Sequence, residues 1–103
     1  FFMSHQEIQY AVIFTSVLNE NSEGYTEAAN EMEELVKNMP GFMGMDSSRT
    51  AIGITVCYWD SLEAIENWKN NQNHQTAREN GKKVWYKMYD VKVCKVLKHY
   101  TFT

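Results

Sequence analysis

Several residue types that would define other classes of protein are scarce in this sequence. It has one proline, five glycines and two cysteines in 103 residues, with no internal repeat and no low-complexity segment. We therefore expect neither a Pro/Gly-rich linker nor a disulfide framework. The cysteines, Cys57 and Cys94, each lie in a strand-like run. We expect two reduced, packed thiols, although a disulfide could form if the two strands are neighbours.

Long apolar runs and an excess of positive charge are also missing. No stretch approaches the roughly 18–20 apolar residues needed to cross a bilayer. Residues 1–7 lack the basic region and the long apolar region of a signal peptide. The net charge of −3 and the scattered lysines give no attraction to phosphate backbones or anionic lipid. The sequence thus predicts a cytoplasmic protein that binds neither nucleic acid nor membrane.

Motifs for metals, nucleotides and nucleophilic catalysis are not found. The histidines His5, His74 and His99 have no ligand spacing, and no cysteine or carboxylate set completes a metal site. Neither a GxGxxG sequence nor a phosphate-binding loop occurs, so no built-in flavin or nicotinamide site is indicated. Cys57 lies in mid-strand without an identifiable activator, so no Cys-His nucleophile is suggested.

The composition that remains is typical of one folded domain. Hydrophobic residues make up 44% and aromatic residues 14% of the chain, which is too apolar for a disordered protein. The length allows one domain over residues 1–103, with its core in residues 8–98. A domain this small has a high surface-to-volume ratio, so a partner that covers apolar surface would stabilise it.

Alternating and continuous apolar runs predict four strands. The strands are expected over Ile8–Leu18, Phe42–Ser48, Ile52–Trp59 and Met88–Leu97. A short polar turn around Arg49-Thr50 joins the middle two as a hairpin.

Helical spacing predicts three helical stretches. The first has an N-cap at Ser22, and its apolar stripe consists of Tyr25, Ala28, Ala29, Met32, Leu35, Val36 and Met39. A capping box at Asp60 and Glu63 begins the second, which turns Leu62, Ile65 and Trp68 inward. A polar break at Asn70-Asn71 separates it from the third, over about residues 72–86. One face of the third stretch carries His74, Ala77, Gly81 and Trp85.

The predicted order is β-α-β-β-α-β, with the second helix broken in two. This is the ferredoxin-like α+β pattern, in which helices cover one face of a four-stranded antiparallel sheet. Both alternating faces of the first strand are apolar, with Tyr10, Val12, Phe14 and Leu18 on one side and Ala11, Ile13 and Val17 on the other. An uncovered face this apolar should not stay in water. We therefore expect a homodimer in which two sheets pack together.

Two segments carry a resemblance to a known family. One is Gly53–Ile65, followed by Trp68 and His74, and the other is Arg78–Tyr89. Together with Pro40-Gly41-Phe42, they resemble the antibiotic biosynthesis monooxygenase (ABM) domain family, the dimeric α/β-barrel group. The similarity runs over about residues 8–97. Its specific part is the combination of YWDSLEAIENW, a histidine and GKKVWYKMY, because each piece alone is weak.

The resemblance implies a homodimer with a pocket between each sheet and its helices. Some family members oxidise polycyclic aromatic substrates with dioxygen and no bound cofactor, and a related branch binds and degrades haem. The haem branch has an Asn in the first strand, a Trp in the second helix and a haem-ligating His about ten residues later. Trp68 fits the second position, but Thr15 and Ser16 stand near the first and Arg78 near the third. The similarity therefore favours the cofactor-independent branch over haem.

The leading functional hypothesis is a cofactor-independent monooxygenase that acts on a small aromatic or conjugated molecule. In it, His74 is the catalytic base or proton carrier, since a neutral imidazole both donates and accepts near pH 7. Trp68 and Trp85 form the wall of the substrate cavity, because such cavities are mostly apolar. Arg78 and Tyr86 orient the substrate.

The same residues also fit structural roles. His74 can be a packed histidine that bonds a backbone carbonyl, and the aromatic residues can belong to the core. Arg78 can be a solvated arginine paired with Glu79. A non-catalytic dimeric module that binds a small ligand is therefore the alternative function. Haem binding or haem degradation is the second alternative.

Overall fold

The computed structural model describes residues 7–103, apart from the side chains of Gln72, Asn73 and Lys83. The expectation that residues 1–7 lack signal-peptide features falls almost wholly outside the described residues. The strands are β1 (Tyr10–Leu18), β2 (Phe42–Arg49), β3 (Gly53–Trp59) and β4 (Tyr86–Lys95). The helices are α1 (Tyr25–Val36), α2 (Leu62–Lys69), α3 (Gln72–Asn80) and the π-helical turn η1 (Gly81–Trp85).

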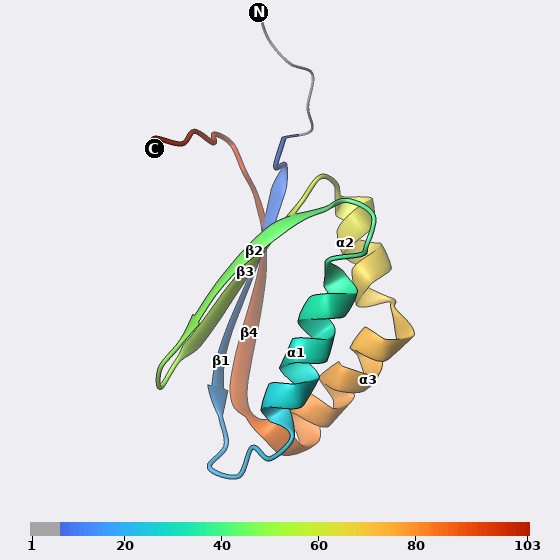
Figure 1. Cartoon of the computed structure of the whole chain (residues 1–103), viewed down its shortest axis with the longest axis vertical. Helices are drawn as coiled ribbons and strands as arrows, with labels where there is room; N and C mark the ends of the chain where they lie inside the picture. Colours follow the sequence, from blue (N-terminus) through green and yellow to red (C-terminus); the bar gives the residue numbers. More distant parts are fainter. Residues whose placement is uncertain (1–6) are drawn as a thin grey trace, which may run out of the picture.

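The four strands form one sheet in the order β2-β3-β1-β4, and every neighbouring pair is antiparallel. The helices all lie on one face of this sheet (Figure 1). The predicted ferredoxin-like α+β fold is therefore confirmed, including the division of the second helix into α2 and α3. No helix among residues 7–103 is both long and apolar enough to span a membrane.

The strand pairing arranges the helix-facing side chains in rows across the sheet. Paired residues on adjacent strands point to the same face, and successive rows lie two residues apart, about 6.6–6.8 Å. The first row is Arg49, Gly53, Ser16 and Tyr89, and the second is Ser47, Thr55, Phe14 and Val91. The third row is Met45, Cys57, Val12 and Val93, and the fourth is Phe42, Trp59, Tyr10 and Lys95.

The core lies where α1 and α2 meet the third and fourth rows. Val36, Trp59 and Ala64 form the buried cluster, and Trp59 is only 1% exposed. Partly buried apolar side chains pack against it, among them Val12, Met45, Cys57 and Trp68. The helices do not cover the whole sheet face, because Val91 and Val93 face the helix side yet remain 48% and 53% exposed.

Two predicted helix starts are wrong. The cap of α1 is Gly24, at φ 87°, and not Ser22, whose carbonyl oxygen accepts a hydrogen bond from the Tyr25 amide. Glycine takes this left-handed conformation without strain, so the chain turns into α1 there. The cap of α2 is Ser61 and not Asp60, because the Ser61 hydroxyl accepts a hydrogen bond from the Ala64 amide at 3.1 Å. The prediction that Leu62 faces inward is also wrong, because this first residue of α2 is 54% exposed.

Two predicted boundaries also move. The third helix ends at Asn80, a π-helical turn follows, and Tyr86 already begins β4. Gly81 permits this arrangement, since a Cβ there would lie 2.7 Å from the Tyr86 ring. Arg49 was expected in a turn, but it is the last residue of β2 and its side chain faces the helices.

The two cysteines are free thiols on opposite faces of the sheet. Cys57 of β3 pairs with Val12 on the helix side, whereas Cys94 of β4 pairs with Ala11 on the open side. Strand β1 lies between them, so the condition for a disulfide is not met. Burial raises the pKa of the Cys57 thiol to about 11, which keeps it protonated.

The open face of the sheet is largely apolar. Its side chains include Ile13, Val17, Ile54, Val56, Tyr58 and Met88. Ile54 is 46% and Met88 45% exposed. Beyond β4, the last residues of the chain extend away from the body of the domain (Figure 1), and Leu97, Tyr100 and Phe102 on this arm are almost fully exposed.

Candidate functional site

His74 lies at the start of α3, against the end of α2. Its imidazole stacks on the Trp68 indole with ring centroids 4.2 Å apart and planes 12° apart. Its backbone amide donates to Asn71 Oδ1 at 3.1 Å, so Asn71 caps the helix that positions the histidine. The polar break predicted at Asn70-Asn71 thus turns the chain so that two helical residues six positions apart become ring neighbours.

The hydrogen bond of the imidazole sets its tautomer. Nδ1 of His74 lies 2.9 Å from the carbonyl oxygen of Trp68. A carbonyl only accepts, so Nδ1 carries the proton and Nε2 keeps its lone pair. Burial lowers the pKa of His74, and the positive charge of Arg78 lowers it further, against the opposing effect of the Trp68 carbonyl. The ring is therefore neutral at pH 7, with Nε2 available as a base.

Nε2 of His74 is not sealed inside the protein. The described residues include no fully buried side-chain nitrogen or oxygen without a hydrogen-bond partner. The hydrogen bonds of His74 to described residues use its backbone amide and Nδ1. The His74 side chain is only partly buried, and among the described residues its Nε2 has no hydrogen-bond partner.

The other residues predicted for the site fall into two groups. Arg78 lies near Trp68 and His74, because its Nη1 donates to the Lys69 carbonyl at 3.4 Å. Trp85 and Tyr86 lie beyond the far end of α3, whose nine residues span about 13 Å. The two groups do not touch directly, and the structure separates them along one side of the sheet.

Trp85 and Tyr86 pack around the start of α1. Trp85 Nε1 donates to the Glu23 carbonyl at 3.0 Å, and its ring meets the Tyr25 ring edge-on at 6.1 Å. The Tyr86 ring contacts Tyr25, Phe14 and Tyr89 at 5.5–5.7 Å. Burial raises the pKa of Tyr86 far above its usual value, so this hydroxyl remains a neutral phenol.

Sequence reasoning missed a polar cluster at this same end of the sheet. The Arg49 guanidinium extends from β2 across Gly53 and bonds the hydroxyl and the carbonyl oxygen of Ser16, which is 0% exposed. It also approaches the Tyr25 hydroxyl at 3.5 Å. The alternation of Met45, Ser47 and Arg49 was the available signal, because it places Arg49 on the helix-facing side.

Two exposed apolar side chains of β4 lie between the two groups in the row order of the sheet. Val91 and Val93 lie in the second and third rows of the sheet, between Tyr89 in the first row and the core cluster that Trp68 packs against. Phe14, the neighbour of Val91 on β1, stacks on Tyr89 with centroids 5.3 Å apart. We call Phe14, Val91 and Val93 the apolar strip. It is a partly exposed hydrophobic surface with Tyr89 at one end.

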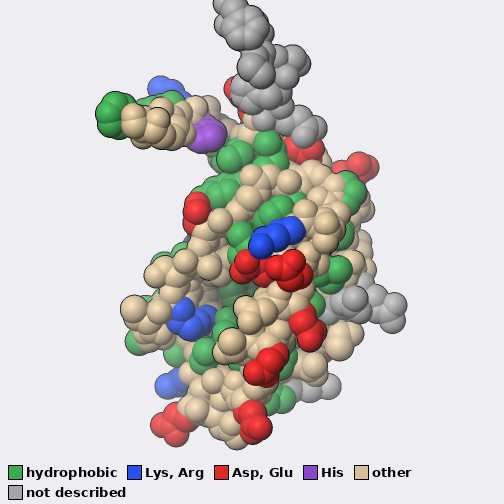
Figure 2. Space-filling view, viewed as in Figure 1, with side chains coloured by type: hydrophobic (Ala, Val, Ile, Leu, Met, Phe, Trp, Pro, Cys, Tyr) green, Lys and Arg blue, Asp and Glu red, His purple; other side chains and the backbone are tan. Residues whose placement is uncertain are grey.

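A cleft of about 370 Å³ also runs between α1 and α3. Its lining residues are Ala28, Glu31, Met32, Leu35, Thr76, Ala77, Asn80 and Trp85. Trp85 is the one residue predicted for the site that appears among these lining residues. The neighbouring outer surface of α1 is acidic, and hydrophobic side chains are visible in a recess between α1 and the sheet (Figure 2).

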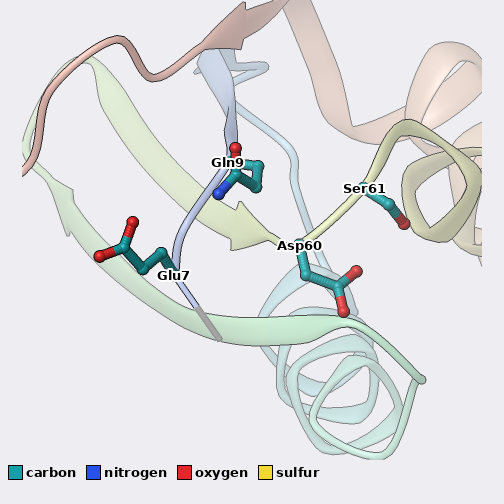
Figure 3. A pocket seen from close by; sticks show the side chains of 4 residues that line it. All are labelled: Glu7, Gln9, Asp60 and Ser61. Carbon is teal, nitrogen blue, oxygen red and sulfur yellow. The ribbon is translucent and has the colours of Figure 1, made fainter. Parts of the chain in front are cut away.

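A second hollow, of about 340 Å³, lies at the opposite end of the sheet. It is lined by Glu7, Gln9, Asp60 and Ser61. The carboxylates of Glu7 and Asp60 point in different directions and do not converge (Figure 3). No group of three potential metal ligands occurs in the described part of the chain. This hollow therefore offers no chemistry that rivals the aromatic side of the domain.

The fold and this arrangement define a class: a ferredoxin-like α+β domain whose aromatic side chains gather between the sheet and its helices. Comparison with known proteins identifies the family. Residues 8–80 match the family model described as Antibiotic biosynthesis monooxygenase. The chain belongs to that family.

Individual proteins are similar to this chain in sequence or in fold. The chain is 52% identical over 89 residues to the Bacillus subtilis protein YqjZ, a match that covers 84% of this chain and 78% of YqjZ. The solved structure of Rv0793 from Mycobacterium tuberculosis is similar with a TM-score of 0.79 at 12% identity, covering 89% of this chain and 98% of that one. The solved structure of a variant of SnoaB, a cofactor-independent oxygenase from Streptomyces nogalater, is similar with a TM-score of 0.76 at 6% identity. The match covers 90% of this chain and 97% of that one. At such identities the structural similarity concerns the fold.

Proposed function

We propose that this protein is a monooxygenase that oxidises a small aromatic or conjugated molecule with dioxygen and without a bound cofactor. The observation that carries the proposal is the state of His74, a partly buried, neutral imidazole that stacks on Trp68 and whose Nε2 has no hydrogen-bond partner among the described residues. Family membership and the fold shared with a cofactor-independent oxygenase support it.

The chemistry requires one base and an electron-rich substrate. Nε2 of His74 removes a proton from a phenol or from an activated CH₂ group, and the resulting anion transfers one electron to dioxygen. The radical and superoxide combine to a peroxide, which takes up a proton from the imidazolium and loses water. For an activated CH₂ group the balance is R₂CH₂ + O₂ → R₂C=O + H₂O. The substrate supplies all four electrons.

The apolar strip suits the ring system of such a substrate. Ligand pockets are mostly hydrophobic, with few polar groups that fix orientation. A flat molecule on Val91 and Val93 would have Trp68 and His74 toward one end and Tyr86 toward the other. In this proposal burial keeps His74 neutral and the charge of Arg78 adds to that effect. Trp85 holds Tyr25 and the start of α1 in place.

The residues do not fit a haem site. Arg78 stands near the position where the haem branch of the family has its ligating histidine, and a guanidinium does not ligate iron. His74 lies four residues before Arg78, and its Nδ1 is held by the Trp68 carbonyl.

We further propose that the protein is a homodimer that packs the open faces of two sheets together. Ile54 and Met88 are exposed on that face, although both are large and apolar. The face also carries Asp90 and Lys92 on β4. A two-fold interface brings a surface against itself, so such a mixed-charge edge can pair with its own copy. The exposed apolar arm beyond β4 would gain cover in the same assembly.

The cytoplasm is the compartment that we propose. Cys57 and Cys94 are free thiols on opposite faces of the sheet. A reducing compartment keeps such thiols in this state.

Dioxygen uptake by the purified protein tests the function. A panel of anthrones, naphthols and dihydroxynaphthalenes should include a substrate that consumes one dioxygen per molecule. His74→Gln should reduce kcat by about 10²–10⁴-fold, whereas Gln75→Ala, at an exposed position of the same helix, should not. Tight retention of a ligand without dioxygen uptake would instead identify a non-catalytic binding module.

A further inference from the structure

Arg49 holds a positive charge inside the helix-covered side of the sheet. Its side chain leaves β2, passes over Gly53 of β3 and reaches Ser16 of β1. Nη1 donates to the Ser16 carbonyl at 3.4 Å, and Nη2 donates to the Ser16 hydroxyl. The guanidinium carbon lies 5.4 Å from the centre of the Tyr25 ring. The charge is thus fixed in place by the sheet and by the first turn of α1.

The partners of this charge are all neutral. The ion pairs among the described residues join Lys37 to Glu33 and Glu34, Lys82 to Glu79, and Lys92 to Asp90, and none of them includes Arg49. A guanidinium has five N–H donors. Its bonds to described residues leave Nε–H and one Nη1–H without an acceptor. A partly buried arginine in this state is a ready partner for an anion.

The nearby tyrosines do not supply that anion. Tyr25 contributes a hydroxyl and a ring face to Arg49. Tyr86 lies 5.7 Å from Tyr25, ring to ring, and burial raises its pKa, so it stays protonated. Among the described residues, the groups around the guanidinium are therefore the hydroxyl and carbonyl of Ser16 and the hydroxyl and ring of Tyr25.

The guanidinium lies close to one end of the apolar strip. Ser16, to which it is bonded, pairs with Tyr89 on β4, and the next row on that strand is Val91. The guanidinium itself lies over Gly53 of β3, so the charge is about one strand spacing, ~4.8 Å, and one row, ~6.7 Å, from Phe14, and one strand further from Val91. His74 and Trp68 lie toward the opposite end. A conjugated ring system with one charged end matches this order of groups.

We propose that Arg49 binds the carboxylate of the substrate, which is an aromatic or conjugated acid. The carboxylate accepts hydrogen bonds from the unused N–H groups of Arg49 in the first row of the sheet. The rings of the substrate lie on the apolar strip, and the carbon that is oxidised faces His74. Arg49 is thus a substrate-binding residue that selects anionic molecules. This inference rests on the proposed monooxygenase function, whose site it extends.

Binding of matched probes tests the inference without any oxidation. Tryptophan fluorescence is titrated with 2-naphthoate and with 2-naphthamide, which has the same rings and no charge. The wild-type protein should bind naphthoate at least about 10-fold more tightly than naphthamide, because hydrogen bonds to charged groups are the stronger ones. Arg49→Gln should remove this preference and leave the affinity for naphthamide within about twofold. Arg49→Lys should restore part of it.

Three results would overturn the inference. These are equal affinity of the wild type for both probes, no binding of either, and an unchanged preference in Arg49→Gln. If Arg49→Gln does not fold, Arg49→Lys and the salt dependence of naphthoate binding to the wild type decide. His74→Gln should keep the preference, so loss of dioxygen uptake with retained naphthoate selectivity would refute the oxygenase and leave the Arg49 site standing.

Discussion

The guanidinium of Arg49 occupies the space that a side chain on Gly53 would fill. The two residues are paired across β2 and β3, and a Cβ on Gly53 would fall well inside van der Waals contact with Cζ, Nη2 and Nε of Arg49. Glycine at this position is therefore what allows a charge on the edge strand to reach Ser16 near the middle of the sheet.

Gly53→Ala should accordingly displace Arg49 and destabilise the domain by about 1–3 kcal/mol, the range expected for overpacking. Urea unfolding measures this change. In an Arg49→Ala background the same substitution should be nearly neutral, because the collision is gone. A double-mutant cycle that shows simple additivity would contradict the contact.

The two serines that precede α1 and α2 make a matched pair of tests. Ser61→Ala should lower stability by about 1 kcal/mol, because it removes the hydroxyl that accepts the Ala64 amide. Ser22→Ala should change stability by less than about 0.5 kcal/mol, since its backbone carbonyl makes the contact with Tyr25. Thermal unfolding compares the two, and equal effects would contradict the assignment of the caps.

The free energy of unfolding of the wild type should decrease as the pH is lowered, because of His74. Burial lowers the pKa of His74 below its ordinary 6.5 in the folded state, so the unfolded chain binds the proton more readily. The contribution is fully present above pH 6.5 and is lost as the pH falls through the lowered value. Between pH 7 and 5.5 the free energy of unfolding should drop more steeply for the wild type than for His74→Gln. Parallel curves would show that His74 is not buried as described.

The proposed dimer predicts unequal effects of two similar substitutions. Ile54→Lys places a charge on the open face, and Leu62→Lys places one on α2, at positions that are 46% and 54% exposed. Sedimentation at micromolar concentration should give twice the chain mass for the wild type and for Leu62→Lys, and the monomer mass for Ile54→Lys. Sedimentation of the wild type at the monomer mass would contradict the proposed dimer.

The sequence was sufficient for the fold because apolar periodicity and strand order determine it. The stripe that includes Val36 on α1 and the alternation through Trp59 on β3 both lead to the observed core. The open apolar face was also expected. Successive strand residues point to opposite faces, so Ile13 and Ile54 face away from the helices while their chain neighbours Phe14 and Thr55 face toward them. These features depend on local patterns, which a single sequence carries.

The site was less predictable because its key contacts join distant segments. The polar pair Arg49-Thr50 predicts a turn, because polar residues favour turns, whereas Arg49 is the last residue of β2. Only the register with Gly53 and Ser16 shows where its charge lies. For His74, the helical face was predicted, but the bond to the Trp68 carbonyl, which sets the tautomer, depends on the α2–α3 junction.

Isotope labelling of the product tests the central claim most directly. A substrate identified by dioxygen uptake is converted under ¹⁸O₂ in ordinary water, and the product is examined by mass spectrometry. The account predicts one ¹⁸O atom in the product, the other in water, and a rate that collapses in His74→Gln. Oxygen incorporated from water, or conversion that proceeds equally in His74→Gln, would contradict it.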